Sequence, residues 1–209
     1  MKRTVVTLAA LLEEAKKRTS AEPDAVTLAD YTSAAAADLK SAGYTDAVPA
    51  LFGTLADYVA RIRLGVEPRG LLLIGSCGIG KTFGARILSA LLGWDFLTSD
   101  DVLDEFADDG YQACVSSTDY FGREPRHLIV DELGAEVCPL VHYGTRTNVL
   151  LDTINKRYNG WIKLGARTVY TTNLTIDDLQ RKYGGPVVDR LFESCRICSF
   201  SAPSLRRKR

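Results

Sequence analysis

One stretch decides the fold of this chain: Leu71-Leu72-Leu73-Ile74-Gly75-Ser76-Cys77-Gly78-Ile79-Gly80-Lys81-Thr82. Its four leading apolar residues predict a buried strand, and the apolar spacing from Phe83 to Leu92 predicts a helix directly after it. The glycines and the Lys-Thr pair match the G-x-x-x-x-G-K-[ST] pattern, in which backbone N–H groups curl around a polyphosphate. We therefore predict a phosphate-binding loop. The alternative, a glycine-rich turn without a chemical role, is disfavoured because the strand and helix are the context that the motif requires.

Each residue type in this loop suits a nucleoside triphosphate. Lys81 would reach the β- and γ-phosphates as a point charge, and the Thr82 hydroxyl would bind the Mg²⁺ ion that holds the triphosphate. The N-terminus of the following helix adds the positive end of its dipole. The sequence thus predicts ATP and Mg²⁺ as cofactors, with nucleotide-binding residues Gly75, Ser76, Cys77, Gly78, Ile79, Gly80, Lys81, Thr82 and Phe83.

The composition is that of a globular protein. The 209 residues are 46% hydrophobic and 25% charged, enough for one domain of ordinary core size with a small appendage. Lys+Arg and Asp+Glu both total 26, so binding to nucleic acid or to an anionic membrane would have to come from a local patch. No apolar run approaches the roughly 18 residues of a membrane span, and the N-terminus does not resemble a signal peptide. We expect a cytoplasmic protein that does not bind membranes.

The five cysteines are odd in number and lack paired zinc-ligand spacing, which suits a reducing compartment. The single C-x-x-C, Cys195-Arg196-Ile197-Cys198, alternates with apolar neighbours. This pattern favours buried strand thiols over a metal or redox site.

Three amphipathic helices are predicted before the loop, over residues 8–20, 27–43 and 50–63. Residues 1–45 are too few to form a stable core alone, so we predict a helical N-terminal extension (1–45) and an ATPase domain (46–209). The extension either packs on the ATPase or presents a face to a partner, and its sequence does not decide between these alternatives.

A second chemical motif follows a predicted strand over 94–97 and a helix from residue 99 or 100. The apolar strand Leu128-Ile129-Val130 ends in Asp131-Glu132, and the carboxyl ends of buried parallel strands are where open α/β sheets bind ligands. Asp131 would hold Mg²⁺ directly or through water, and Glu132 would polarise the attacking water as general base. A strand followed by an acidic turn is common, but its position downstream of a phosphate loop favours the functional role.

A third candidate residue ends the predicted strand over 168–173. The Asn173 carboxamide could orient the attacking water beside the γ-phosphate, or it could cap the following turn, and composition favours neither. Helices over 149–158, 175–183 and 187–193 and a last strand over 196–200 complete the α/β pattern.

In this order the motifs resemble the AAA+ ATPases, and the second half narrows the resemblance to the DnaC/IstB-like family of helicase loaders and transposition helper ATPases. The resemblance covers about residues 53 to 206. It implies an α/β P-loop NTPase fold, with a parallel sheet flanked by helices and no C-terminal helical lid. The matching stretches are 75–82, Leu128-Ile129-Val130-Asp131-Glu132-Leu133-Gly134, Lys156-Arg157-Tyr158, Thr171-Thr172-Asn173-Leu174, Val187-Val188-Asp189-Arg190-Leu191 and Ser204-Leu205-Arg206.

The resemblance also implies roles for single residues. Asn173 matches the sensor-1 asparagine, Arg190 the arginine finger that reaches the nucleotide of a neighbouring subunit, and Arg206 the sensor-2 arginine. Guanidinium groups suit these tasks because they stay charged and offer forked donors. The alternatives are a surface salt bridge for Arg190 and a solvated basic tail for Arg206. The expected catalytic residues are thus Lys81, Glu132, Asn173, Arg190 and Arg206, with Thr82 and Asp131 as Mg²⁺ ligands.

At the level of function, the resemblance implies a Mg²⁺-dependent ATPase that loads or regulates a hexameric replicative helicase through ATP-dependent self-association on DNA, with single strands expected. A first alternative is a transposition helper that binds duplex DNA and recruits a transposase. A second is an ATP-switched adaptor that does not hydrolyse ATP, against which the Asp131-Glu132 pair speaks.

Overall fold

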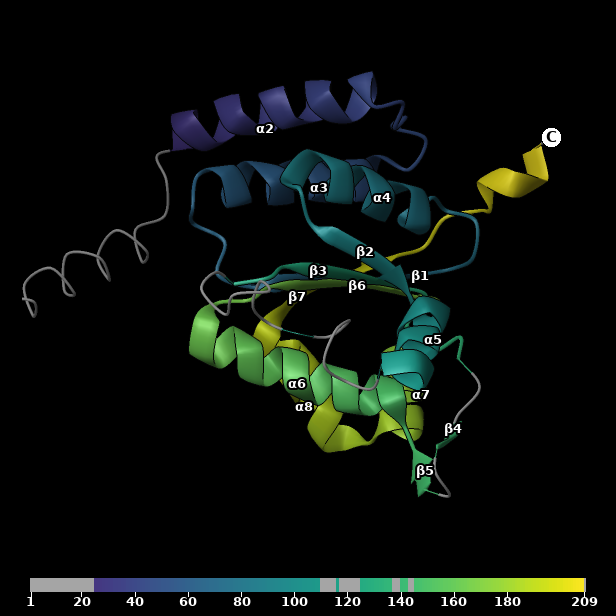
Figure 1. Cartoon of the computed structure of the whole chain (residues 1–209). Helices are drawn as coiled ribbons and strands as arrows, with labels where there is room; N and C mark the ends of the chain where they lie inside the picture. The colour runs from purple at the N-terminus through teal and green to yellow at the C-terminus, as the bar shows by residue number, and fades with distance from the viewer. Residues whose placement is uncertain (1–24, 110–115, 117–124, 137–139, 143–144, 209) are drawn as a thin grey trace, which may run out of the picture.

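A five-stranded parallel sheet forms the centre of the molecule in this computed structural model, which describes residues 25–109, 116, 125–136, 140–142 and 145–208 (Figure 1). All four neighbouring strand pairs are parallel. The predicted α/β fold with a parallel sheet is therefore confirmed. In spatial order the strands are β2 (Asp95–Thr98), β3 (Leu128–Asp131), β6 (Thr168–Thr172), β1 (Gly70–Gly75) and β7 (Cys195–Phe200).

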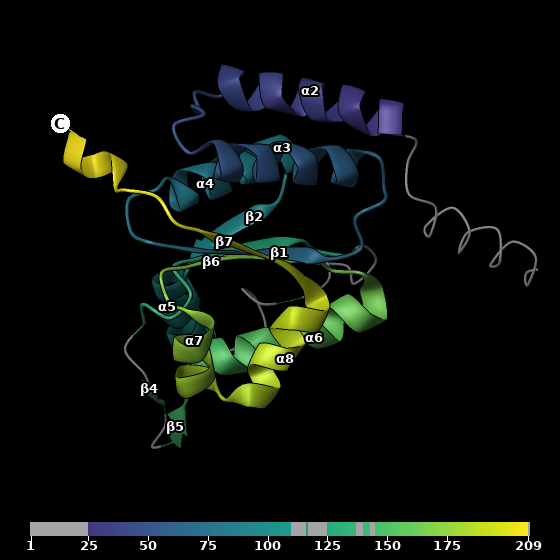
Figure 2. The same cartoon turned by 180° about the vertical axis from the view of Figure 1, so that it is seen from behind.

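Helices cover both faces of the sheet (Figure 1, Figure 2). One face carries α3 (Pro49–Arg63) and α4 (Lys81–Leu92), with α2 (Ala25–Ser41) lying on α3. The other face carries α5 (Ser99–Asp109), α6 (Val149–Leu164), α7 (Ile176–Tyr183) and α8 (Gly185–Ser194). The remaining elements are a two-stranded antiparallel sheet of β4 (Leu140–His142) and β5 (Thr145–Thr147), and the 3-10 helix η2 (Leu205–Lys208).

The apolar run of β1 is explained by burial on both faces. Leu71 and Leu73 belong to the core beneath α3 and α4, whereas Leu72 and Ile74 belong to the core above α6 and α8. Successive side chains of a strand point to opposite faces, so a strand covered on both sides tends to be apolar along its whole length.

The strand order brings three loops to one edge of the sheet. β6 lies between β1 and β3, so the carboxyl ends of these three strands are neighbours. Gly75, Asp131 and Thr172 close the three strands, and the polar residues that follow them therefore meet at the same edge. The chain order alone, with β6 last of the three, does not reveal this neighbourhood.

One predicted element cannot be compared with the structure, and several others differ from the predictions. The helix predicted over residues 8–20 lies outside the described residues. α6 continues past residue 158 to Leu164, where Gly165 in the left-handed conformation (φ 70°) ends it. α8 begins at Gly185 because Pro186 occupies its first turn, a position that proline tolerates well. The β4–β5 pair was not predicted from the sequence.

The described part of the N-terminal extension packs on the rest of the chain. Ala35 and Leu39 of α2 are fully buried in the same apolar cluster as Leu51 and Leu55 of α3. Tyr44 follows α2 and reaches the phosphate loop, where its hydroxyl lies 3.4 Å from the carbonyl oxygen of Gly80. The domain division at residue 45 stays a prediction.

The structure also bears on the predictions for the cysteines, for a metal site and for membrane spans. Cys195 and Cys198 both lie in β7 as free thiols, and burial raises the pKa of the Cys195 thiol to about 12. Among the described residues, no group of three or more His, Cys, Asp or Glu side chains could hold a metal ion. None of the helices described here is long and apolar enough to cross a membrane.

Candidate nucleotide-binding site

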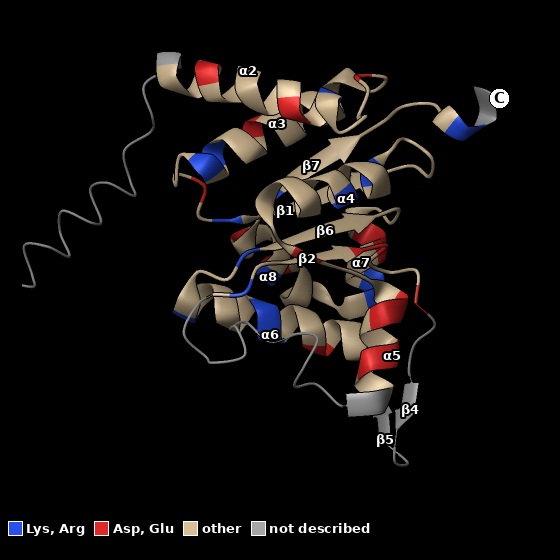
Figure 3. Ribbon diagram, turned by 45° about the horizontal axis from the view of Figure 1, so that its top comes forward, with Lys and Arg blue, Asp and Glu red and all other residues tan. Residues whose placement is uncertain are grey.

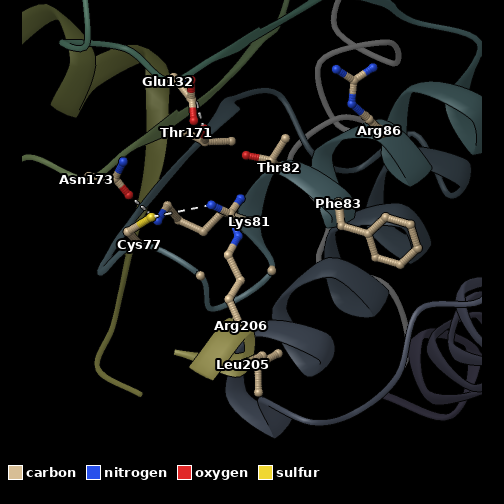
Figure 4. A pocket seen from close by; sticks show the side chains of 12 residues that line it. Cys77, Lys81, Thr82, Phe83, Arg86, Glu132, Thr171, Asn173, Leu205 and Arg206 are labelled. Atoms are coloured by element: carbon tan, nitrogen blue, oxygen red, sulfur yellow. Dashed lines mark hydrogen bonds between the residues drawn. The ribbon is translucent and has the colours of Figure 1, made fainter. Parts of the chain in front are cut away.

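A cavity of about 640 Å³ opens at the carboxyl edge of the sheet, beside the start of α4 (Figure 4). Residues from the phosphate loop, from the ends of β3 and β6, and from the C-terminal segment all contribute to its walls. The lining residues are Cys77, Gly78, Gly80, Lys81, Thr82, Phe83, Arg86, Glu132, Thr171, Asn173, Leu205 and Arg206.

The phosphate loop needs glycine at two positions. Gly78 and Gly80 have φ values of 85° and 98°, in the region that disfavours side chains. At Gly78 a Cβ atom would also lie 2.2 Å from the Ser204 hydroxyl oxygen. Gly80 immediately precedes the first turn of α4, so the loop places the N-terminus of that helix at the cavity.

Lys81 is buried at the bottom of the loop with its ammonium fully engaged. Its Nζ atom donates to the carbonyl oxygens of Gly75 (2.7 Å) and Ser76 (3.0 Å) and to Oδ1 of Asn173 (2.8 Å). Burial lowers the pKa of Lys81, and the nearby Cys77, Asp131 and Glu132 oppose this shift. The amine is therefore held at the loop by three oxygens that an anionic phosphate could replace.

The remaining loop residues divide between the cavity and the interior. Phe83 is 49% exposed and stacks on Tyr44, with ring centroids 5.7 Å apart. Ile79 is buried in the apolar core, and the Ser76 hydroxyl donates to the carbonyl oxygen of Ala202. The Ile79 side chain thus packs in the core, and the Ser76 hydroxyl joins the loop to the C-terminal segment.

The two acidic residues after β3 have different environments. Asp131 is 1% exposed and accepts a hydrogen bond at Oδ1 from the Thr171 hydroxyl (2.5 Å). Glu132 is exposed, lines the cavity and has a φ of 60°, the only positive value among the described non-glycine residues. The buried carboxylate is therefore fixed in place, while the exposed one faces the space where a substrate would lie.

The donor set fits Mg²⁺. The Thr82 hydroxyl lines the cavity, and hydroxyl and carboxylate oxygens are the hard ligands that this ion prefers. Asp131 lies behind the cavity wall, which suits a contact through a water molecule better than a direct one. When bound, the ion would neutralise charge on the phosphates.

The C-terminal segment closes one side of the phosphate loop. After β7 the chain crosses to the loop and ends in η2 (Figure 2). The backbone N–H of Leu205 donates to the carbonyl oxygen of Gly78 (3.0 Å), and Arg206 extends toward the Cys77 sulfur (3.9 Å). Arg206 thus lines the predicted nucleotide site.

Arg190 lies elsewhere. It is on α8, where its guanidinium donates to Oδ1 of Asn155 and lies 5.6 Å from the centre of the Tyr158 ring. It does not line the cavity of its own chain. If Arg190 takes part in nucleotide chemistry, it must therefore do so at the nucleotide site of another subunit.

Sequence reasoning missed three residues of this site. Thr171 and Arg86 line the cavity, and Tyr44 supports Phe83 and Gly80. Arg86 could have been found, because it follows Thr82 by one helical turn and so lies on the same face of α4. Thr171 could have been suspected from its place two residues before Asn173, whereas no local pattern marks Tyr44.

Comparison of the sequence with known protein families finds no match, and comparison with curated proteins also finds none. Several solved structures have a similar chain course, and two of them are described here. The DnaC helicase loader is 23% identical with a TM-score of 0.45, covering 64% of this chain and 79% of that chain. A candidate primosome component from Streptococcus pyogenes serotype M3 is 22% identical with a TM-score of 0.42, covering 65% and 69%. The chemistry of the site is therefore inferred from its own geometry.

Proposed function

We propose that this chain binds and hydrolyses ATP with Mg²⁺ as a member of the DnaC/IstB-like AAA+ family, and that it loads or regulates a replicative helicase. The observation that carries the ATPase part is the meeting of Lys81, Thr82, Glu132 and Asn173 around one cavity at the carboxyl edge of the sheet. Lys81 and Thr82 begin α4, whereas Glu132 and Asn173 follow β3 and β6, and together they supply a cation, a metal ligand, a base and an amide.

Each residue has a defined task in this proposal. The loop N–H groups and Lys81 bind the phosphates, with Lys81 exchanging its present oxygen partners for phosphate oxygens. Glu132 accepts a proton from the attacking water, and Asn173 orients that water from the neighbouring strand end. Arg206 contacts phosphate from the C-terminal side, while Arg190 completes the site of an adjacent subunit.

The helicase-loading part of the proposal rests on the order of the sequence motifs, above all Thr171-Thr172-Asn173-Leu174 and Val187-Val188-Asp189-Arg190-Leu191. The distribution of charge agrees with DNA binding that depends on assembly. Figure 3 shows acidic residues concentrated along α5 and basic residues dispersed over several elements. Single subunits should therefore bind DNA weakly, and more tightly once ATP joins several of them.

Steady-state ATPase measurements test the enzymatic proposal. Lys81→Ala should lose ATP binding, whereas Glu132→Gln should retain binding and lose turnover by about a hundredfold or more. Glu105→Gln on α5 is the matched control, since Glu105 does not line the cavity. Full turnover by Glu132→Gln would refute the assignment of the base, and tight ATP binding without any wild-type turnover would favour an adaptor.

Partner capture tests the biological part. The Glu132→Gln protein should stay in its ATP-bound form because it hydrolyses ATP slowly. It is mixed with ATP and, in separate experiments, with a purified hexameric helicase or a purified transposase. Lys81→Ala serves as the nucleotide-free control. Co-elution of the helicase only with the ATP-bound form supports the proposal. Selective retention of the transposase, together with a preference for duplex DNA across salt concentrations, would replace loading by transposition.

A further inference from the structure

Thr171 makes two hydrogen bonds that join the neighbouring acidic residues. Its hydroxyl donates to Oδ1 of Asp131 (2.5 Å) and accepts from the backbone N–H of Glu132 (3.0 Å). A hydroxyl has one proton to give and can also accept, so a single threonine can satisfy both groups at once. Thr171 is 1% exposed, which keeps these bonds away from competing water.

Ser99 holds the same pair of residues from the opposite side. It is the first residue of α5, directly after β2, and it is 1% exposed. Its hydroxyl lies 3.2 Å from the carbonyl oxygen of Asp131 and 3.0 Å from that of Glu132. The backbone of the acidic pair is thus bound by one hydroxyl from each neighbouring strand end.

These contacts explain how Glu132 keeps an unfavourable backbone conformation. A φ of 60° is uncommon for a residue with a side chain, and such conformations persist where the surroundings determine them fully. Here the N–H of Glu132 is bound by Thr171, and its carbonyl oxygen accepts from Ser99 and from the N–H of Ala135 (3.0 Å). The left-handed turn directs the Glu132 carboxylate into the cavity, although the preceding Asp131 is buried.

The sheet topology makes this arrangement possible. β3 lies between β2 and β6, so both hydroxyl residues come from strands paired with β3. Val169 and Ile129 belong to the core beneath α4, and Thr171 and Asp131 each follow two residues later on the same face of their strand. Thr171 therefore reaches Asp131 on the side of the sheet where the phosphate loop passes.

We propose that Thr171 and Ser99 are positioning residues for the acidic pair: the Thr171 hydroxyl sets the orientation of the Asp131 carboxylate, and both hydroxyls hold Glu132 in the conformation that aims its carboxylate at the cavity. This inference rests on the proposed ATPase function. It assigns neither residue to the chemical step, because each acts through Asp131 or Glu132.

The test compares four variants of the full chain. Thr171→Val removes the hydroxyl at nearly constant volume, Thr171→Ser keeps it, and Ser99→Ala removes the second hydroxyl. Thr153→Val is the matched control, since Thr153 is also fully buried but donates only to Val149 within α6. The measurements are kcat, KM for ATP, the thermal midpoint, and Mn²⁺ affinity from electron paramagnetic resonance with a non-hydrolysable ATP analogue.

Thr171→Val should lower kcat by about tenfold to a hundredfold and weaken Mn²⁺ binding by about tenfold, because it removes a hydrogen bond to a charged group. Its affinity for the analogue without metal should stay near that of the wild type. Thr171→Ser should restore both kcat and Mn²⁺ affinity. Ser99→Ala should lower kcat with a smaller effect on Mn²⁺, since its contacts are to carbonyl oxygens alone.

Three outcomes would overturn the inference: Thr171→Val equal to Thr153→Val in kcat and Mn²⁺ affinity, Thr171→Ser as impaired as Thr171→Val, or unchanged kcat in Ser99→Ala. The Ser99→Ala and Thr171→Ser results decide the matter if Thr171→Val does not fold. Failure of the proposed function looks different, because the wild-type chain itself would then show no turnover. In that event Mn²⁺ affinity, measured on the same variants, still decides whether Thr171 orients Asp131.

Discussion

The Lys81 ammonium and the Asn173 carboxamide are 2.8 Å apart although 92 residues separate them in the chain. This bond connects the phosphate loop to the end of β6. The same two groups are the ones expected to meet the γ-phosphate, so binding of ATP should exchange one contact of Lys81 for another. At the candidate nucleotide site, the Asn173 oxygen thus occupies a position on Lys81 that a phosphate oxygen would take.

Asn173→Asp should weaken ATP binding by at least about tenfold, because the new carboxylate pairs with Lys81 and repels phosphate. Asn173→Ala should keep ATP binding within a few-fold and mainly lower kcat. Titration with a fluorescent ATP analogue separates the two variants. Asn159→Asp on the exposed part of α6 is the control for an added charge, and equal binding by both Asp variants would refute the exchange of partners.

Gly78→Ala should cost more stability than Gly93→Ala and should also abolish ATP binding. Both glycines have positive φ, so both substitutions carry backbone strain of about 1 kcal/mol or more. Only at Gly78 would the added Cβ atom meet Ser204, whereas the space around Gly93 is open. Thermal denaturation of the two variants measures this difference. Equal losses of stability would mean that Ser204 and the C-terminal segment can move aside without destabilising the fold.

Arg157→Met should lower the free energy of unfolding by about 2–4 kcal/mol, because it removes the four hydrogen bonds of a guanidinium that is only 1% exposed. The buried guanidinium donates to the carbonyl oxygens of Ser116, Arg126 and Arg167 and to the Thr168 hydroxyl. Its burial lowers the pKa of Arg157 to about 10.

The control for this change is Arg181→Met, since Arg181 lies exposed on α7 and should contribute less than about 1 kcal/mol. Arg157→Lys should also destabilise the fold, because an ammonium on a single stem cannot span these separated acceptors. Urea denaturation measures all three, and a loss in Arg157→Met no larger than that in Arg181→Met would contradict the structural role.

Stability should fall as the pH drops from 6.5 toward 4, in part through His127. Burial, with Arg167 and Arg157 nearby, lowers the pKa of His127 from 6.5 to about 4, and its Nδ1 atom accepts the backbone N–H of Arg167. The unfolded chain binds a proton at this residue between those two pH values and the folded chain does not, so acid favours unfolding. His127→Gln should reduce the slope of unfolding free energy against pH between 5 and 6.5, and an unchanged slope would exclude His127 as its source.

Mixed oligomers test whether Arg190 acts on a neighbouring subunit. Arg190→Ala and Glu132→Gln proteins should each lack ATPase activity, and mixtures of the two should recover part of it, because some interfaces then combine an intact base with an intact arginine. Arg181→Ala is the control for loss of a positive charge. Absence of recovery at every mixing ratio would leave Arg190 with the contacts that it makes to Asn155 and Tyr158 in its own chain.

Local sequence patterns predicted much of this molecule. The five strands of the sheet and the phosphate loop were recognised because apolar runs, glycine positions and helical spacing act over a few residues. The same reasoning made Lys81, Glu132 and Asn173 candidate site residues, since each closes or follows a recognised element, and all three line the cavity. It placed helix ends less well, as for α6, where only the backbone at Gly165 defines the last turn.

The sequence by itself determined which segments form the five-stranded sheet, which loop has the phosphate-binding pattern and which polar residues follow those strands. Only the tertiary structure decided that β6 separates β1 from β3, and this placed Asn173 against Lys81 and Thr171 between the two acidic residues. It also set the C-terminal segment on the phosphate loop and Arg190 away from it. The physical reason is that hydrogen bonds between distant segments depend on strand order and packing, which short-range periodicity does not encode.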